Sequence, residues 1–136
     1  MKIKELMIGD WIEVNEIKSR VFELAYNRVE HEMTIGILDP NNEIYSCYEG
    51  YDHIEPIPLT GTILEANGFE TRGTRTHYYI KDDYYDMELD EYSDGVWLVS
   101  FMSRDYSLPL EQLSMSYVHE FQHFLRFCAI EKDIEL

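Results

Sequence analysis

The sequence predicts an α+β protein in which a small SH3-like antiparallel β-barrel is followed by an antiparallel sheet with one C-terminal helix. Alternating runs in two regions of the chain predict the strands, and one periodic stretch predicts the helix. Short runs of alternating apolar and polar residues, separated by turn residues, fill residues 1–58 and return in residues 71–102. Helical periodicity of apolar residues appears in one long stretch, from Ser116 to about Ile130. The length of 136 residues suits one domain or two very small ones in contact.

The first region, residues 1–58, consists of strand-like runs at close spacing. Gly9-Asp10 predicts a turn before an alternating strand that ends at Val14. Asp39-Pro40-Asn41-Asn42 and Glu49-Gly50 predict further turns. The last segment, Ile54 to Leu59, holds two prolines and favours an extended edge or connector. The other expected strands are Val21–Ala25, Met33–Leu38 and Ile44–Tyr48.

The second region, residues 59–136, is predicted to be a sheet of three or four strands with a short helix before it and a long helix after it. Thr60 is a candidate N-cap for the short helix, and Asn67-Gly68 is a stop signal. Ser93-Asp94-Gly95 is a candidate hairpin turn. Ser116 is expected to cap the long helix, with Glu120 in its first turn. The strands are expected at Thr71–Ile80, Tyr84–Leu89 and Val96–Met102.

The apolar positions of these elements predict the core. In the long helix, a projection at about 100° per residue places one apolar stripe on one face, with His119, His123, Arg126 and Phe127 on the opposite face. The expected core residues are Ile8, Trp11, Val14, Ile35, Ile37, Ile54, Leu64, Phe69, Trp97, Val99, Phe101, Val118, Phe121, Leu125 and Cys128.

The charge excludes two classes of partner. The chain holds 27 acidic and 11 basic residues, for a formal net charge of −16. Direct binding to nucleic-acid phosphates or to an anionic membrane needs a basic surface, so neither is expected. No apolar run of signal-peptide length occurs near Met1. Cys47 and Cys128 form neither a CxxC pair nor a zinc-ribbon spacing. We therefore expect a cytoplasmic protein with two buried thiols.

One motif invites a chemical hypothesis. His119-Glu120-Phe121-Gln122-His123 matches H-E-x-x-H, in which two histidines on one helix face bind zinc and the glutamate acts as general base on the bound water. A zinc-dependent hydrolase with these residues is therefore one alternative. The third ligand is missing, because Arg126 and Ala129 occupy the Gly and His positions of the extended pattern.

Upstream histidines leave that alternative open, since His53 or His77 could complete the ligand set. The simpler interpretation is an ordinary surface helix whose histidines face solvent or a partner. We therefore predict no catalytic, cofactor-binding or metal residue, and keep Glu120 as base and His119 and His123 as zinc ligands for the enzyme alternative.

A second concentration of functional groups is the acidic segment Asp82–Asp94, in which seven of thirteen residues are acidic. EF-hand registers starting at Asp86 or Asp90 fail, because Trp97 or Phe101 then occupies the position of the bidentate glutamate. Calcium sites of other kinds stay open. Spaced carboxylates could also mimic nucleic acid and occupy a basic groove of a DNA-binding protein. The simplest interpretation is a solvated strand whose polar face is acidic.

Aromatic residues in the first region are a weaker signal. Tyr45, Tyr48 and Tyr51, with Trp11, could line a peptide groove on a small barrel, although aromatic residues in such a barrel more often pack in the core or at an edge. No phosphate-binding loop, dinucleotide fingerprint or nucleophile elbow occurs.

Three segments together resemble a known group of proteins. KELMIGDWI (residues 4–12), YDHIEPIPLTGTILEANGF (51–69) and YVHEFQHFLRFCAIEKDIEL (117–136) resemble a family of small uncharacterised proteins from Bacteroides-type gut bacteria and from their phages and mobile elements. The resemblance implies a source and an architecture, and it implies no reaction. Taken together, the sequence predicts a non-enzymatic accessory protein, associated with a phage or mobile element, that binds an unknown protein partner.

Overall fold

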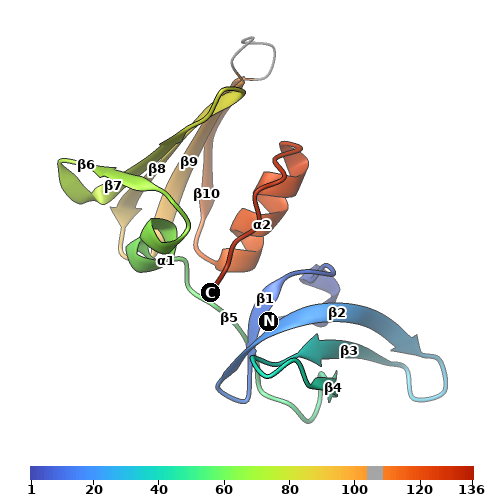
Figure 1. Cartoon of the computed structure of the whole chain (residues 1–136). Coiled ribbons are helices and arrows are strands. Elements are labelled where there is room, and N and C mark those ends of the chain that lie inside the picture. The colour runs from blue at the N-terminus through green and yellow to red at the C-terminus, as the bar shows by residue number, and fades with distance from the viewer. Residues whose placement is uncertain (104–108) are drawn as a thin grey trace. The chain divides into compact units, whose positions relative to one another are not determined.

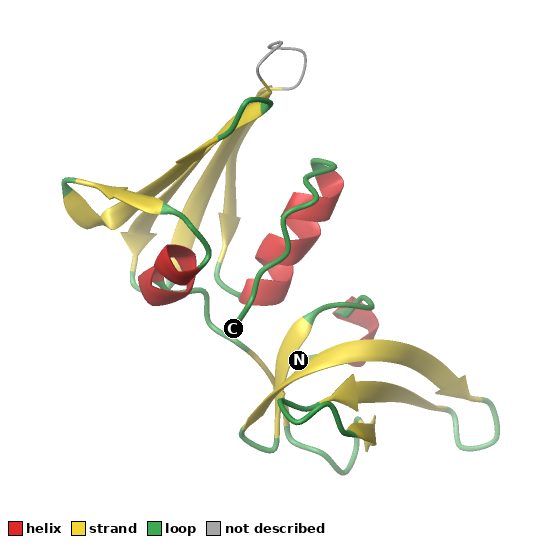
Figure 2. Cartoon of the chain, viewed as in Figure 1, coloured by secondary structure: helices red, strands yellow, loops and turns green. Residues whose placement is uncertain are grey.

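The computed structural model describes residues 1–103 and 109–136 and has two antiparallel five-stranded sheets and two helices (Figures 1 and 2). This confirms the predicted α+β class. The chain divides into two compact units, Met1–Ile57 (unit 1) and Pro58–Leu136 (unit 2). The sequence-based boundary lies between residues 58 and 59, and the sequence left open whether the two regions are separate domains.

Unit 1 is built on a sheet with the strand order β4-β3-β2-β1-β5, in which every pair is antiparallel. Within the described residues neither sheet of the chain closes, so a closed SH3-like barrel is not confirmed, and β4 and β5 form the two edges of this sheet. A single 3₁₀ turn, η1, precedes the strands. The elements are η1 (Ile3–Glu5), β1 (Trp11–Val14), β2 (Ile17–Asn27), β3 (Glu32–Leu38), β4 (Ile44–Tyr48) and β5 (Ile54–Pro56).

The core of unit 1 lies on one face of this sheet, which we call its inner face. Of the predicted core residues, Val14, Ile35 and Ile37 are buried there, whereas Trp11 and Ile54 are half-buried. The prediction for Ile8 is wrong, because its side chain is 63% exposed. The complete buried cluster is Ile3, Leu6, Ile12, Val14, Val21, Ile35, Ile37 and Cys47.

A tight turn explains the error at Ile8. Gly9 has a φ of +94°, a conformation that glycine adopts without steric cost. The turn leaves Ile8 outside and brings Asp10 into the interior, where it is fully buried. The Asp10 carboxylate accepts a hydrogen bond from the Met7 backbone N–H at 2.7 Å. The buried residue at this turn is therefore the hydrogen-bonded Asp10, and the predicted core residue Ile8 is exposed.

Unit 2 is built on a meander, with the strand order β10-β9-β8-β7-β6. The predicted single strand at 71–80 is two strands, because Gly73, with a φ of +80°, turns the chain between them. The hairpin at Ser93-Asp94-Gly95 is confirmed, and β10 was not predicted. The elements are α1 (Gly61–Ala66), β6 (Glu70–Arg72), β7 (Thr74–Lys81), β8 (Tyr85–Ser93), β9 (Val96–Ser103), β10 (Pro109–Met115) and α2 (Val118–Phe127).

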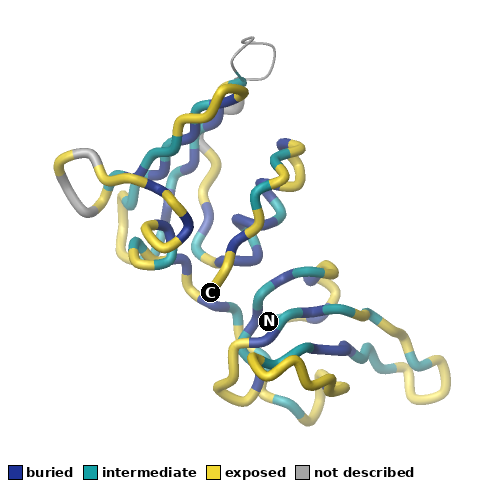
Figure 3. Tube along the Cα trace, in the orientation of Figure 1, coloured by how far each residue is buried: buried dark blue, intermediate teal, exposed yellow. Residues whose placement is uncertain are grey.

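The core of unit 2 lies between one face of this sheet and the two helices (Figure 3). Ring contacts join the layers: Phe124 of α2 lies 6.4 Å from Phe101 of β9, and Phe121 lies 5.9 Å from Phe69. Every core residue predicted in this unit is buried: Leu64, Phe69, Trp97, Val99, Phe101, Val118, Phe121, Leu125 and Cys128. The apolar stripe of the C-terminal helix is thereby confirmed.

Local capping sets the ends of both helices. The Thr60 side chain accepts the Ile63 backbone N–H at 3.3 Å, which confirms Thr60 as the N-cap of α1. The second helix begins at Val118, two residues after the predicted Ser116, because Tyr117 is still extended at a φ of −125°. It ends at Phe127, and Ala129 then adopts a φ of +56°, which cannot continue a right-handed helix.

The C-terminal residues are held by two polar side chains of unit 2. Asn67 donates to the backbone carbonyls of Ile63 (2.8 Å) and Glu135 (2.9 Å) and accepts the Glu135 N–H (2.8 Å). Gln122 of α2 is 2% exposed and donates to Asp133 at 3.3 Å. In the part of the chain that the structure describes, no helix has the length and apolar character that a bilayer crossing requires.

Candidate functional site

The H-E-x-x-H motif lies on the first two turns of α2. His119 is only 5% exposed, which corrects the expectation that it faces away from the packed side of the helix. Its ring stacks on that of Tyr117, with centroids 5.9 Å apart, and meets the ring of His123 edge to face at 5.7 Å. The spacing of four residues therefore brings the two imidazoles together, as the motif requires.

The glutamate of the motif has a structural partner. One oxygen of Glu120 accepts the backbone N–H of Ser116 at 2.7 Å and that of Tyr117 at 3.1 Å. These are N–H groups at the start of α2, which have no acceptor within the helix. Glu120 therefore caps the helix from its N3 position, in the manner of the glutamate of a capping box. A general base would instead have to lie against a metal-bound water.

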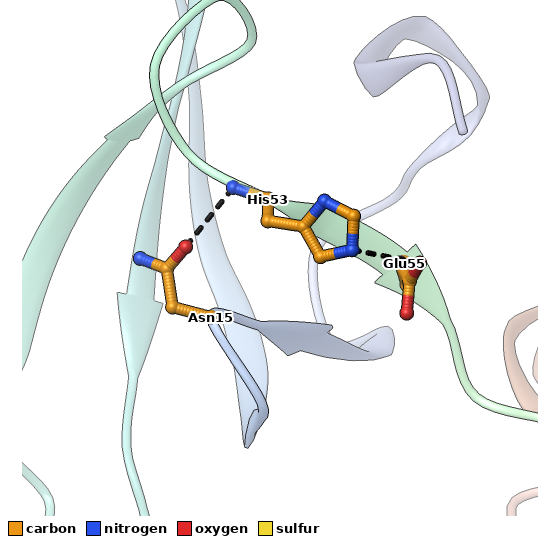
Figure 4. Close-up of polar contacts among 3 residues, drawn as sticks. All are labelled: Asn15, His53 and Glu55. Atoms are coloured by element: carbon orange, nitrogen blue, oxygen red, sulfur yellow. Dashed lines mark hydrogen bonds and ion pairs between the residues drawn. The ribbon is translucent and has the colours of Figure 1, made fainter.

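The upstream histidines proposed as a third ligand have other neighbours. Nε2 of His53 lies 2.8 Å from the Glu55 carboxylate in unit 1 (Figure 4), and His77 hydrogen-bonds Asp90 across β7 and β8. Among residues 1–103 and 109–136, no group of three or more His, Cys, Asp or Glu side chains is arranged to hold a metal ion. The described residues thus offer His119 and His123 as possible zinc ligands and place no third ligand beside them.

The two cysteines are shielded. Cys47 and Cys128 are both buried and neither forms a disulfide. Burial raises the pKa of each thiol to about 11, and the nearby Asp52 carboxylate contributes to the rise at Cys47. Because the thiolate is the nucleophile, a raised pKa makes both side chains poor nucleophiles near neutral pH.

The acidic segment 82–94 contains all of β8, and buried and less buried residues alternate in it from Tyr85 to Asp90. Tyr85, Met87 and Leu89 are buried, and Asp86, Glu88 and Asp90 point to the opposite face of the sheet. Tyr84, with which the predicted strand began, is 80% exposed and lies just before β8.

Cross-strand neighbours balance part of this acidic face. In the ladder between β7 and β8, Lys81 lies opposite Asp86, and His77 lies opposite and bonds to Asp90. Charges opposite one another on adjacent strands stabilise the pairing. This face therefore carries fewer uncompensated carboxylates than the sequence alone indicated.

Unit 1 has a hollow of about 340 Å³ on its inner face, which we call the inner hollow. The buried side chains of Val14, Ile37 and Cys47 form apolar surface within it, and the carboxylates of Asp39 and Asp52 line it as well. A hollow with apolar walls and fixed negative charges suits a long cationic side chain, whose aliphatic stem can be buried while its charged end meets a carboxylate. The remaining lining residues are Asn15, Ile17, Ser19, Tyr45 and Ser46.

Local hydrogen bonds hold both carboxylates of the inner hollow in place. Oδ1 of Asp39 accepts the backbone N–H groups of Asn41 and Glu43, each at 2.9 Å. Asp52 accepts the Tyr48 N–H at 2.8 Å with one oxygen and the Asn15 side-chain amide at 3.1 Å with the other. Each carboxylate is thus positioned before any ligand arrives, which lowers the entropy cost of binding.

Asn15 connects two turns that are distant in sequence. It lies in the two-residue turn between β1 and β2, where Asn15 and Glu16 have φ values of +49° and +68°, as a type I′ turn requires. Its backbone N–H donates to the His53 carbonyl at 2.9 Å, and its side-chain oxygen accepts the His53 N–H at 3.0 Å (Figure 4). These bonds place Asp52 beside the inner hollow.

A second depression of about 430 Å³, the outer hollow, is lined by Glu30, Glu32, Tyr48 and Tyr51. The rings of Tyr48 and Tyr51 meet edge to face with centroids 6.4 Å apart. An aromatic pair beside two carboxylates attracts a cation through both ring and charge interactions. The expected aromatic groove is therefore divided between two hollows, and Trp11 lines neither of them; it lies under the Arg20 guanidinium, 5.3 Å away.

In comparisons with known protein families, curated proteins and solved structures, the chain matches none of them.

Proposed function

We propose that the protein is a non-enzymatic interaction protein that uses unit 1 to bind a basic segment of another protein. The observation that carries this proposal is the pair of acidic hollows in unit 1, each of which combines tyrosine with two carboxylates. Residues 1–57 hold 12 acidic and five basic side chains, a net charge of −7, so the field around both hollows attracts a cationic partner.

The enzyme alternative has less support. Glu120 is engaged as a helix cap, and the described residues supply no third ligand beside His119 and His123. The nucleic-acid mimic also has less support, because Lys81 lies opposite Asp86 and His77 hydrogen-bonds Asp90, so two carboxylates of β8 already have neighbours within the sheet. A basic protein partner is common to the mimic and to our proposal; the two differ in the unit that binds it.

We also propose that the chain belongs with the small proteins of Bacteroides-type bacteria and their phages and mobile elements. The three segments that carry the resemblance each have a structural role in this fold. Residues 4–12 contain the Gly9-Asp10 turn, residues 51–69 contain the helix cap and the Asn67 bonds, and residues 117–136 contain the Glu120 cap. A shared architecture would keep such residues without a shared reaction.

The proposal is tested with a fluorescein-labelled decapeptide of alternating Lys and Thr, titrated against the full chain and followed by fluorescence anisotropy. We expect binding that weakens with added salt, and none for the Glu/Thr peptide. A double variant, Asp39→Asn with Glu32→Gln, should weaken binding by at least about fivefold, because each hollow loses one charge.

The matched control removes the same charge from unit 2, with Glu88→Gln and Asp94→Asn. We expect this double variant to bind as the wild type does. Equal losses in the two double variants would mean that the peptide responds to net charge alone, and the proposal would then be wrong. A loss confined to the unit 2 variant would favour the nucleic-acid mimic instead.

A further inference from the structure

Among the sheet edges formed by residues 1–103 and 109–136, β4 lacks the usual protection. Sheet edges are commonly shortened or interrupted by proline or charge, so that they do not pair with other chains. In this chain β5 and β6 have three residues each, β5 contains Pro56, and β10 begins at Pro109 and has an irregular register near Leu110. β4 reads IYSCY, with five residues, no charge and no proline.

The backbone of β4 shows where this edge is open. Tyr48 points its polar groups away from β3: its N–H donates to Asp52 at 2.8 Å, and its C=O accepts the N–H groups of Tyr51 (3.1 Å) and Asp52 (3.0 Å). In an antiparallel ladder every second residue points its backbone groups the same way. Ser46 and Ile44 therefore point theirs away from β3 as well.

The other residues of β4 face β3. The Asp39 N–H donates to the Glu43 carbonyl at 3.0 Å, which continues the ladder, so the backbone groups of Glu43 point towards β3. Because every second residue points its backbone groups the same way, those of Tyr45 and Cys47 also point towards β3. Within unit 1, the described residues pair β4 with β3 alone. The turn at Asp52 covers the edge at Tyr48, and the edge from Ile44 to Ser46 is left open.

The two hollows lie beside β4 on opposite faces of the sheet: the inner hollow adjoins the open edge, and the outer hollow adjoins its end at Tyr48. Tyr45 and Cys47 of β4 line the inner hollow, and Tyr48 lines the outer hollow. Side chains of a strand added beside β4 would point alternately to the two faces. Side chains on the face of Tyr45 would then lie towards the inner hollow, and those on the face of Tyr48 would lie towards the outer hollow, and both hollows contain carboxylates.

We propose that β4 receives an antiparallel β-strand from a basic partner protein, whose backbone bonds to Ile44 and Ser46 and whose Lys or Arg side chains enter the inner or the outer hollow. This inference rests on the proposed function and specifies the mode of binding. Main-chain bonds supply affinity in such strand addition, and pockets for alternate side chains supply specificity. A second copy of this chain is a poor occupant, because unit 1 has a net charge of −7 and would repel itself.

The partner's backbone provides the sharpest test, because it leaves the protein unchanged. The alternating Lys/Thr decapeptide is made in two N-methylated forms, one methylated at two central Lys amides and one at two central Thr amides. In an added strand every second amide bonds to β4, so one form should lose at least about tenfold in affinity and the other should bind nearly as the parent does. Equal affinities of the two forms would overturn the strand-addition mode.

The N-methylated peptide that loses affinity also predicts which hollow receives the lysine side chains. Two residues that exchange hydrogen bonds across an antiparallel pair have their side chains on the same face of the sheet. A peptide residue that bonds to Ser46 therefore has its side chain on the face opposite the inner face, which is the face of Tyr48. If methylation of Lys amides is the harmful change, Glu32→Gln should weaken binding and Asp39→Asn should not. If methylation of Thr amides is harmful, the two variants should behave the other way round. Any other combination would contradict the antiparallel geometry.

A variant of the edge itself gives an independent readout. Ser46→Pro removes an N–H that points away from β3, a position at which an edge strand accepts proline. Ser46→Ala keeps that N–H and is the matched control. We expect Ser46→Pro to lose at least about tenfold in peptide affinity with an unchanged circular dichroism spectrum, and Ser46→Ala to bind as the wild type does.

The possible outcomes separate the two proposals. If no basic peptide binds the wild type, the proposed function fails, and this inference fails with it. If the peptide binds and the Asp39/Glu32 charge variant weakens it, but Ser46→Pro and both N-methylated forms bind fully, the function stands and strand addition is wrong. Concentration-dependent dimers of the wild type that Ser46→Pro abolishes would show that a second copy occupies the edge, and would overturn the basic partner.

Discussion

Units 1 and 2 are each built on a five-stranded antiparallel sheet, but they complete their cores differently. In unit 2 the helices α1 and α2 cover one sheet face, so rings such as Phe121 and Phe124 fill the space above it. In unit 1 the elements beside the sheet are limited to the three-residue turn η1, and a hollow remains on its inner face. A helix both supplies core volume and covers the sheet beneath it.

The presence or absence of covering helices also decides whether polar side chains hold the fold together or line a hollow. In unit 2, Glu120, Asn67 and Gln122 are engaged with backbone or side-chain partners that hold the helices and the C-terminal residues. In unit 1, Asp39 and Asp52 are held by their neighbours and still line a hollow. The motif that looked most chemical in the sequence is thus structural in large part, and the surface suited to a ligand lies in unit 1.

The largest expected effect comes from truncating the core of one unit at a time. Phe121→Ala should destabilise unit 2 by about 3–5 kcal/mol, and Ile35→Ala should destabilise unit 1 by about 2–5 kcal/mol, since each side chain is fully buried and leaves a cavity. Each unit holds one tryptophan, Trp11 or Trp97. Urea unfolding followed by the fluorescence of one tryptophan, with the other replaced by phenylalanine, reports each unit.

If the units fold separately, Phe121→Ala should shift the Trp97 transition and leave that of Trp11 in place, and Ile35→Ala should do the reverse. A shift of both transitions by either variant would show that the two units unfold as one cooperative domain.

An intermediate effect is expected from the two asparagines that tie distant segments together. Asn67→Ala removes three hydrogen bonds from a nearly buried site and should cost about 2 kcal/mol. Asn15→Ala removes two side-chain bonds from an exposed site and strains a residue with positive φ, and should cost about 1–2 kcal/mol. Chemical denaturation measures both.

The variant Asn15→Gly separates the two causes at that site, because glycine accepts the left-handed backbone and loses only the bonds. We expect it to be more stable than Asn15→Ala and to weaken peptide binding equally, since both release Asp52. Peptide affinity equal to that of the wild type in both variants would mean that Asp52 does not need this support.

The smallest effect is expected at Glu120. Glu120→Ala removes the acceptor for two N–H groups at the start of α2 and should cost about 1 kcal/mol, whereas Glu120→Gln keeps an oxygen in place and should cost less than half as much. The zinc content of the purified protein should be the same in all three forms. Equal losses of unfolding free energy for the two substitutions would contradict the capping role of Glu120. Zinc bound in stoichiometric amount would support the zinc-hydrolase alternative.

Elements with a local cause could be predicted from the sequence. The strand at Ile44–Tyr48, the Thr60 cap and the apolar stripe of α2 follow from alternation, capping chemistry and helical period, all of which act over a few residues. The turn at Asn15-Glu16 carried a usable signal, since asparagine tolerates positive φ, but it lacks the glycine that usually follows.

Tertiary structure alone decided the candidate site. The bonds of Asn15 to residues 52 and 53 span 37 and 38 positions, and those of Asn67 to Glu135 span 68, so no local pattern reports them. The period of α2 predicted an apolar face but not that His119 would also be covered. Periodicity records which side of an element is apolar, whereas the partner that covers it, and the edge that stays open, depend on how strands from the whole unit pair.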